Sequence, residues 1–164
     1  MKNTTKKLPI LFVVLVTLIF FVSACRANIS RNEDGSLAVE TTISRQELQE
    51  AITASIADPL IKELNVSLQS EYVLVTGQRQ RLNDASKIDS LTFRLDLGVS
   101  NGQLTAVISN AQLDGIPVEQ TRVDHWNQTI ASRLVILGKK NPNSSLESVN
   151  VMPDAVSMTW KVSK

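Results

Sequence analysis

The chain has 164 residues, of which 43% are hydrophobic and 20% are charged, and its formal net charge is +1 at pH 7. A near-neutral chain without a run of basic residues lacks the electrostatic footprint of a nucleic-acid-binding protein. One cysteine and one histidine exclude an intramolecular disulfide and leave only carboxylates as plausible ligands for a metal site.

The first 24 residues have the three-part pattern of a secretory signal peptide. Three lysines and no acidic residue precede an apolar run, Leu8–Val22, and two small residues, Ser23 and Ala24, follow it. The run is slightly short for a membrane span, which needs about 20 residues. We therefore predict that residues 1–24 are a signal peptide.

Cys25 lies directly after this pattern, where the apolar run gives way to polar sequence. The stretch Val22-Ser23-Ala24-Cys25 resembles the lipobox of bacterial lipoproteins, which has an aliphatic residue, two small residues and then cysteine. The resemblance implies that the thiol carries a diacylglyceryl group and that the preceding peptide is removed. Two alternatives stay open: an uncleaved anchor helix, and an ordinary signal peptide whose mature form keeps a free thiol.

Lipidation at Cys25 predicts where the protein is located. Each buried methylene contributes about 0.8 kcal/mol to membrane binding, and firm attachment takes more than one acyl chain. The resemblance implies an exported protein anchored to the outer face of the bacterial cell membrane, or to an outer membrane if one is present. Removal of Lys2, Lys6 and Lys7 would leave 14 basic residues against 16 acidic ones.

The mature chain begins with a polar segment, residues 25–36, which we predict to be a lipidated N-terminus and tether or a frayed first hairpin. Residues 37–164 are then one domain, long enough to bury a core. Apolar residues alternate over residues 36–43, which predicts a half-buried strand. Ser44 and Glu47 have the spacing of a capping box, so a helix is expected from about Arg45 to Ala57.

Four strands are predicted to follow, at residues 64–68, 72–81, 91–99 and 103–115, with a turn-rich loop over residues 81–89. Asn101-Gly102 is a favoured pair for a two-residue hairpin, because both residues tolerate positive φ. The apolar alternation slips by one residue at Ser109-Asn110, which predicts a β-bulge.

A second, longer helix is predicted from about Glu119 to Leu137, with Gly138 as its C-cap. Two strands follow it, at residues 146–152 and 156–162. Nearly every strand alternates, so each has one solvated face. The sequence predicts an α+β fold in which a curved antiparallel sheet of about six or seven strands packs on one face against two helices.

No motif for catalysis or cofactor binding is present in this order of elements. His125 follows Asp124 on the predicted long helix, where adjacent residues do not face each other. The acidic residues of the strands and loops are scattered, and no P-loop, EF-hand loop or nucleophile elbow occurs. We therefore expect no enzyme activity, no metal and no cofactor, with a hydrolase as the least favoured alternative.

Bulky apolar side chains gather on the predicted helix stripe and the strands that face it. They either fill an ordinary core or line an apolar groove that takes an acyl chain, since ligand pockets are concave and mostly apolar. The candidate groove residues are Phe93, Trp126, Ile130, Leu134, Met158 and Trp160.

The layout as a whole resembles a family of small bacterial envelope proteins. A helix opening "ISRQELQEAI", a meander ending "VSNGQLTAVISNAQLDGIPV", a long helix and a terminal hairpin are similar to the YceB-like lipoproteins and the LmeA-like phospholipid-binding proteins of the tubular lipid-binding superfamily. The resemblance covers residues 43–162. It implies a curved sheet around the long helix with an interior that accepts lipid. Because this chain is short, we expect a shallow groove.

We therefore predict a membrane-anchored lipoprotein whose domain binds a lipid or other amphiphile. The alternative is an interaction module that presents the outer sheet face or an edge strand to an unidentified envelope protein.

Overall fold

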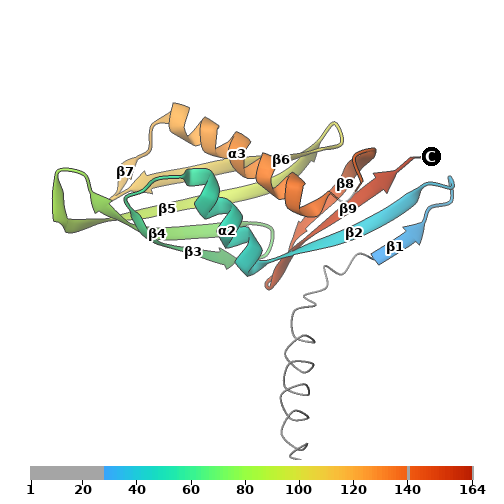
Figure 1. Cartoon of the computed structure of the whole chain (residues 1–164), viewed down its shortest axis with the longest axis horizontal. Helices are drawn as coiled ribbons and strands as arrows, with labels where there is room; N and C mark the ends of the chain where they lie inside the picture. Colours follow the sequence, from blue (N-terminus) through green and yellow to red (C-terminus); the bar gives the residue numbers. More distant parts are fainter. Residues whose placement is uncertain (1–27, 140, 164) are drawn as a thin grey trace, which may run out of the picture.

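The computed structural model describes residues 28–139 and 141–163. Cys25 and the predicted signal peptide lie outside these residues. The described chain forms two helices and nine strands (Figure 1). In chain order they are β1 Asn28–Arg31, β2 Leu37–Ser44, α2 Arg45–Ile56, β3 Ile61–Leu68, β4 Val73–Arg81, β5 Asp84–Ser100, β6 Gln103–Leu113, β7 Ile116–Pro117, α3 Gln120–Gly138, β8 Ser144–Val151 and β9 Ala155–Val162.

The predicted α+β class is confirmed, but the strands form two antiparallel sheets where the sequence predicted one. A four-stranded sheet has the order β1-β2-β9-β8, and a five-stranded sheet has the order β3-β4-β5-β6-β7. Along the chain, the five-stranded sheet lies between α2 and α3, and the four-stranded sheet joins the two ends of the chain because β2 pairs with β9. The sheets meet where the Leu146 N–H donates to the Gly102 carbonyl, with an N···O distance of 2.8 Å.

The first helix begins where its capping box predicts. The Ser44 hydroxyl accepts a hydrogen bond from the Glu47 N–H at 3.3 Å, and the Glu47 carboxylate accepts one from the Ser44 N–H at 2.8 Å. This reciprocal pair satisfies two backbone donors that a helix start leaves without a partner. The helix ends at Ala57, which has the left-handed conformation of a C-cap.

Two features of the predicted meander are also confirmed. Asn101 and Gly102 both have positive φ, 52° and 73°, as a two-residue hairpin requires. Thr92 pairs with Gln112 and Arg94 with Ser109, so two residues of β6 lie opposite Phe93 alone. Asn110, at this bulge, has a φ of 54°. The slip in the apolar pattern therefore marks a real β-bulge.

The loop predicted over residues 81–89 is wrong, because β5 already begins at Asp84. The β4–β5 hairpin turns at residues 82–83, and Arg81 lies opposite Asp84. The segment has no apolar alternation because residues 85–88 are exposed and the first buried side chain of the strand is polar. Asp89 is buried there and accepts hydrogen bonds from the Arg81 guanidinium.

Gly138 does not form the predicted C-cap. The helix α3 includes it, and the cap is Lys139, in an extended conformation with a φ of −79°. A Cβ atom on Gly138 would lie 2.7 Å from the Met158 sulfur and 3.4 Å from both the Thr41 hydroxyl and the Trp160 ring. The missing side chain therefore lets the end of α3 approach the four-stranded sheet closely.

Both helices pack on the same face of the five-stranded sheet, with α2 beside β3 and α3 beside β6 (Figure 1). Apolar residues from both helices and both sheets form one core. Part of the segment predicted as a tether or hairpin, residues 28–31, pairs with β2 as β1.

Candidate functional site

The six candidate groove residues all belong to the apolar core. Their side chains are at most 4% exposed, and Ile130, Leu134 and Met158 are fully buried. The rings of Phe93 and Trp126 lie 6.0 Å apart between their centroids. Trp126 also borders a void of only about 10 Å³. The middle of the space between α3 and the five-stranded sheet is thus filled by side chains. Any open groove therefore lies toward the ends of the helix.

An open cleft does lie between the second half of α3 and the strands, and we call it the helix–sheet cleft. Trp160, one of the six candidates, lines it, and its volume is about 410 Å³, within the range of ligand pockets. The Trp160 indole N–H donates to the Thr41 hydroxyl at 3.0 Å, which fixes the ring beside the cleft. The other lining residues are Gly102, Gln103, Leu104, Ala131, Ser132, Val135, Ile136 and Lys139.

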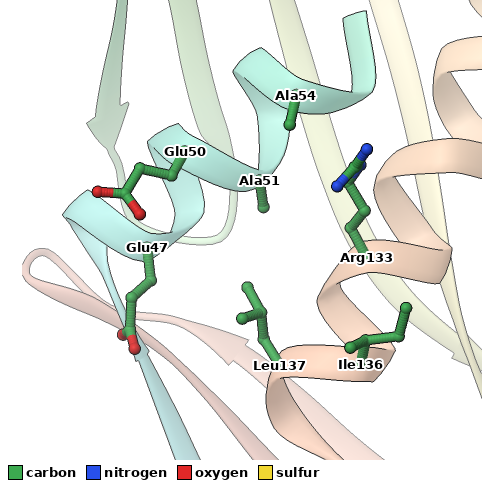
Figure 2. Close-up of a pocket in the computed structure, with 7 residues that line it drawn as sticks. All are labelled: Glu47, Glu50, Ala51, Ala54, Arg133, Ile136 and Leu137. Atoms are coloured by element: carbon green, nitrogen blue, oxygen red, sulfur yellow. The ribbon is translucent and has the colours of Figure 1, made fainter.

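A second cleft, the helix–helix cleft, lies on the opposite side of α3, where it faces α2 (Figure 2). Its volume is about 300 Å³, and Ala51, Ala54 and Leu137 form its apolar part. Figure 2 shows Glu47 and Glu50 on the α2 side and Arg133 on the α3 side. The two carboxylates already have partners, since Glu47 caps α2 and Glu50 accepts a hydrogen bond from Gln46.

Ile136 lines both clefts, and its side chain is 76% exposed. It lies outside the buried stripe of α3, so the helical periodicity of core residues does not identify it. A large apolar residue on the solvent side of a helix is the signal that identifies it. Isolated exposed apolar residues are ordinary, but this one stands between two hollows with mostly apolar walls.

Paired charges lie at the opposite end of α3, beside an open cleft of about 400 Å³ in which five of the nine lining residues are charged. Arg79 donates to Asp58 at 2.7 Å, and both side chains are less than one fifth exposed. Arg81 contacts both Asp89 and Asp114. Burial by itself raises the pKa of Asp58, but hydrogen bonds from the Arg79 guanidinium and the Leu60 N–H together outweigh it and hold that pKa below its usual value. The Asp58 carboxylate therefore stays ionised and paired with Arg79 at neutral pH, which makes it a poor general acid.

The remaining polar residues that the sequence singled out do not come together. His125 is exposed on α3, and Asp124 accepts a hydrogen bond from Gln120 at 2.8 Å. Asp96 binds Arg94 on the outer sheet face, and Asp84 accepts hydrogen bonds from Ser86. Among residues 28–139 and 141–163, no cluster of three or more histidine, cysteine or acidic side chains is arranged to hold a metal ion.

No protein-family model, curated protein or solved structure matches this chain. Neither of the two described helices is both long enough and apolar enough to cross a membrane. The two clefts beside the second half of α3 have mostly apolar linings, whereas the cleft at its start is lined mainly by charged residues, so the first two define the candidate site for an apolar ligand.

Proposed function

We propose that this protein is an exported lipoprotein, anchored through Cys25 to the outer face of a bacterial membrane, whose domain binds a lipid or other amphiphile without catalysis. The anchor rests on the lipobox sequence Val22–Cys25. The proposal that the domain binds such a ligand is supported by one observation, the open helix–sheet cleft beside Trp160.

The lining of this cleft suits a single acyl chain with an acidic head. Leu104, Val135 and Trp160 supply apolar and aromatic surface. Lys139, at the end of α3, supplies a positively charged ammonium group. Lys139 forms no ion pair with any other residue that the structure describes. A fatty acid would bury its chain against the apolar wall and place its carboxylate near the ammonium group.

The two tryptophans provide a matched test of this site. Brominated fatty acids quench tryptophan fluorescence on contact. In the purified full-length protein, Trp126→Phe leaves Trp160 beside the cleft, whereas Trp160→Phe leaves Trp126 in the core. We expect saturable quenching in the first variant and little in the second. Filling the cleft with Ala131→Phe should weaken binding roughly tenfold, which corresponds to about 1.4 kcal/mol. Equal quenching of both tryptophans, or none of either, would contradict the proposal.

The anchor is tested separately by feeding cells a clickable palmitate. We expect the wild-type protein to incorporate the label and to sediment with membranes. The Cys25→Ser variant should do neither, because two or more acyl chains supply nearly all of the attachment. Labelling that persists in this variant, or is missing from the wild-type protein, would rule out lipidation at this position.

A further inference from the structure

One apolar surface of the domain is left uncovered by the helices. It lies on the inner face of the four-stranded sheet and consists of Ile29, Leu37, Val39 and Val162, which we call the apolar shelf. Ile29 is 63% exposed and Leu37 is 37% exposed. Strand register places the four together, because Ile29 pairs with Val39 and Leu37 pairs with Val162.

The shelf is exposed because α3 stops short of it. Farther along the same face of β2, Thr41 and Ile43 are buried in the core. The last residue of α3, Gly138, lies against Thr41 and Met158, the inward-facing pair next to the shelf, and against Trp160, which pairs with Val39 at the edge of the shelf. In Figure 1, β1 and the first part of β2 extend past the end of α3.

The shelf continues into the helix–sheet cleft. Trp160, which lines the cleft, lies directly opposite Val39 of the shelf in the β2–β9 pairing. A molecule that leaves the cleft on this side therefore passes over apolar side chains rather than directly into water.

The predicted anchor lies close to this surface along the chain. Cys25 precedes Asn28, the first residue of β1, by three residues. Three peptide units span no more than about 11 Å. Acyl chains on Cys25 would therefore hold β1, and with it Ile29, at the membrane surface.

Basic residues border the shelf. Arg31 lies opposite Leu37 in the β1–β2 pairing. It is two residues from Ile29 on β1, so both side chains lie on the same face of the sheet. Lys139 follows the end of α3. Neither side chain forms an ion pair with another described residue. Lysine and arginine side chains near a membrane surface are attracted to anionic lipid headgroups, so these two cations favour contact of the shelf with such a surface.

We propose that the apolar shelf rests on the bilayer in which Cys25 is anchored, so that the helix–sheet cleft opens toward the lipid surface. This inference rests on the proposed function, because the anchor at Cys25 brings the shelf to the membrane.

The test uses the full-length lipidated protein with one added cysteine, because the lipidated Cys25 does not react with thiol reagents. Leu37→Cys and Ile29→Cys place an environment-sensitive fluorophore on the shelf. Thr42→Cys places it on the opposite, exposed face of the same strand β2. Each labelled protein is reconstituted into vesicles of phosphatidylcholine and phosphatidylglycerol that contain brominated lipids. We expect a blue shift and strong quenching at the two shelf positions and neither at position 42.

The outcomes separate this inference from the proposed function. If palmitate labels Cys25 but shelf probes are quenched no more than the probe at position 42, the shelf does not face the membrane and the anchor stands. If palmitate is not incorporated, the proposed function and this inference both fail. A blue shift that appears in detergent without vesicles and grows with protein concentration would assign the shelf to a second copy of the chain and overturn the membrane contact.

Discussion

Replacing Ile130 with alanine is expected to lower the free energy of unfolding by about 2–5 kcal/mol, the usual cost of removing a large buried aliphatic side chain. Ile130 is fully buried on the inner side of α3. The loss combines the transfer free energy of the deleted methylene and methyl groups with the cost of the cavity they leave. Urea denaturation followed by circular dichroism measures it.

Ile136→Ala is the matched control, because it makes the same substitution on the same helix at a side chain that is 76% exposed. Its effect should stay within about 0.5 kcal/mol, as for most surface substitutions. The comparison reports whether the interior under α3 is solid. If Ile130→Ala costs no more than Ile136→Ala, that interior is hollow or wet, and a ligand site would extend beneath the whole helix rather than begin at the helix–sheet cleft.

Replacing Arg79 with methionine is expected to cost about 2–4 kcal/mol at pH 7, near the range for breaking a buried ion pair. The methionine keeps most of the apolar length but leaves the Asp58 carboxylate, 17% exposed, without its guanidinium partner. The matched control is Arg94→Met, which removes an arginine from an exposed pair with Asp96 and from the face of Tyr72. That change should cost only about 1 kcal/mol, because exposed ion pairs and cation–π contacts are each weak.

The effect of Arg79→Met should also depend on pH. The pKa of Asp58 is lowered in the folded protein, so its pair with Arg79 stabilises the fold above the unfolded-state pKa of about 3.9. This contribution is lost as the pH falls through the lower folded-state value. In the variant the carboxyl pKa should rise, so acid removes less stability from it. The difference in free energy of unfolding between the wild-type protein and the variant should therefore become smaller below about pH 4. A difference that stays constant from pH 7 to pH 3 would show that Arg79 acts through packing alone.

The two ends of α3 have different surroundings. Near its start, the Arg79–Asp58 and Arg81–Asp89 pairs lie beside a cleft whose lining is mostly charged, which suits an apolar chain poorly. At its end, Gly138 brings the helix onto the four-stranded sheet and the clefts open beside Ile136. A ligand is therefore expected at the second end, next to the shelf that we propose faces the membrane.

The local elements could be predicted from the residues that form them. The Ser44–Glu47 capping box, the Asn101-Gly102 hairpin and the bulge beside Asn110 each depend on residues close together in the chain. Their conformations follow from short-range hydrogen bonds and allowed backbone angles, which a few neighbouring residues specify. The buried stripe of α3 was predictable for the same reason, since helical periodicity repeats within two turns.

How these elements combine depends on contacts between residues that are far apart in the chain. The division into two sheets depends on which distant strands pair, and the polar start of β5 depends on Arg81 neutralising Asp89 across the hairpin. The close approach at Gly138 involves Met158 and Thr41, which are remote in the chain. The apolar shelf exists because α3 ends before the four-stranded sheet does, and the clefts lie where α3 meets α2 on one flank and the strands on the other. Packing sets these relative positions, and no local pattern specifies them.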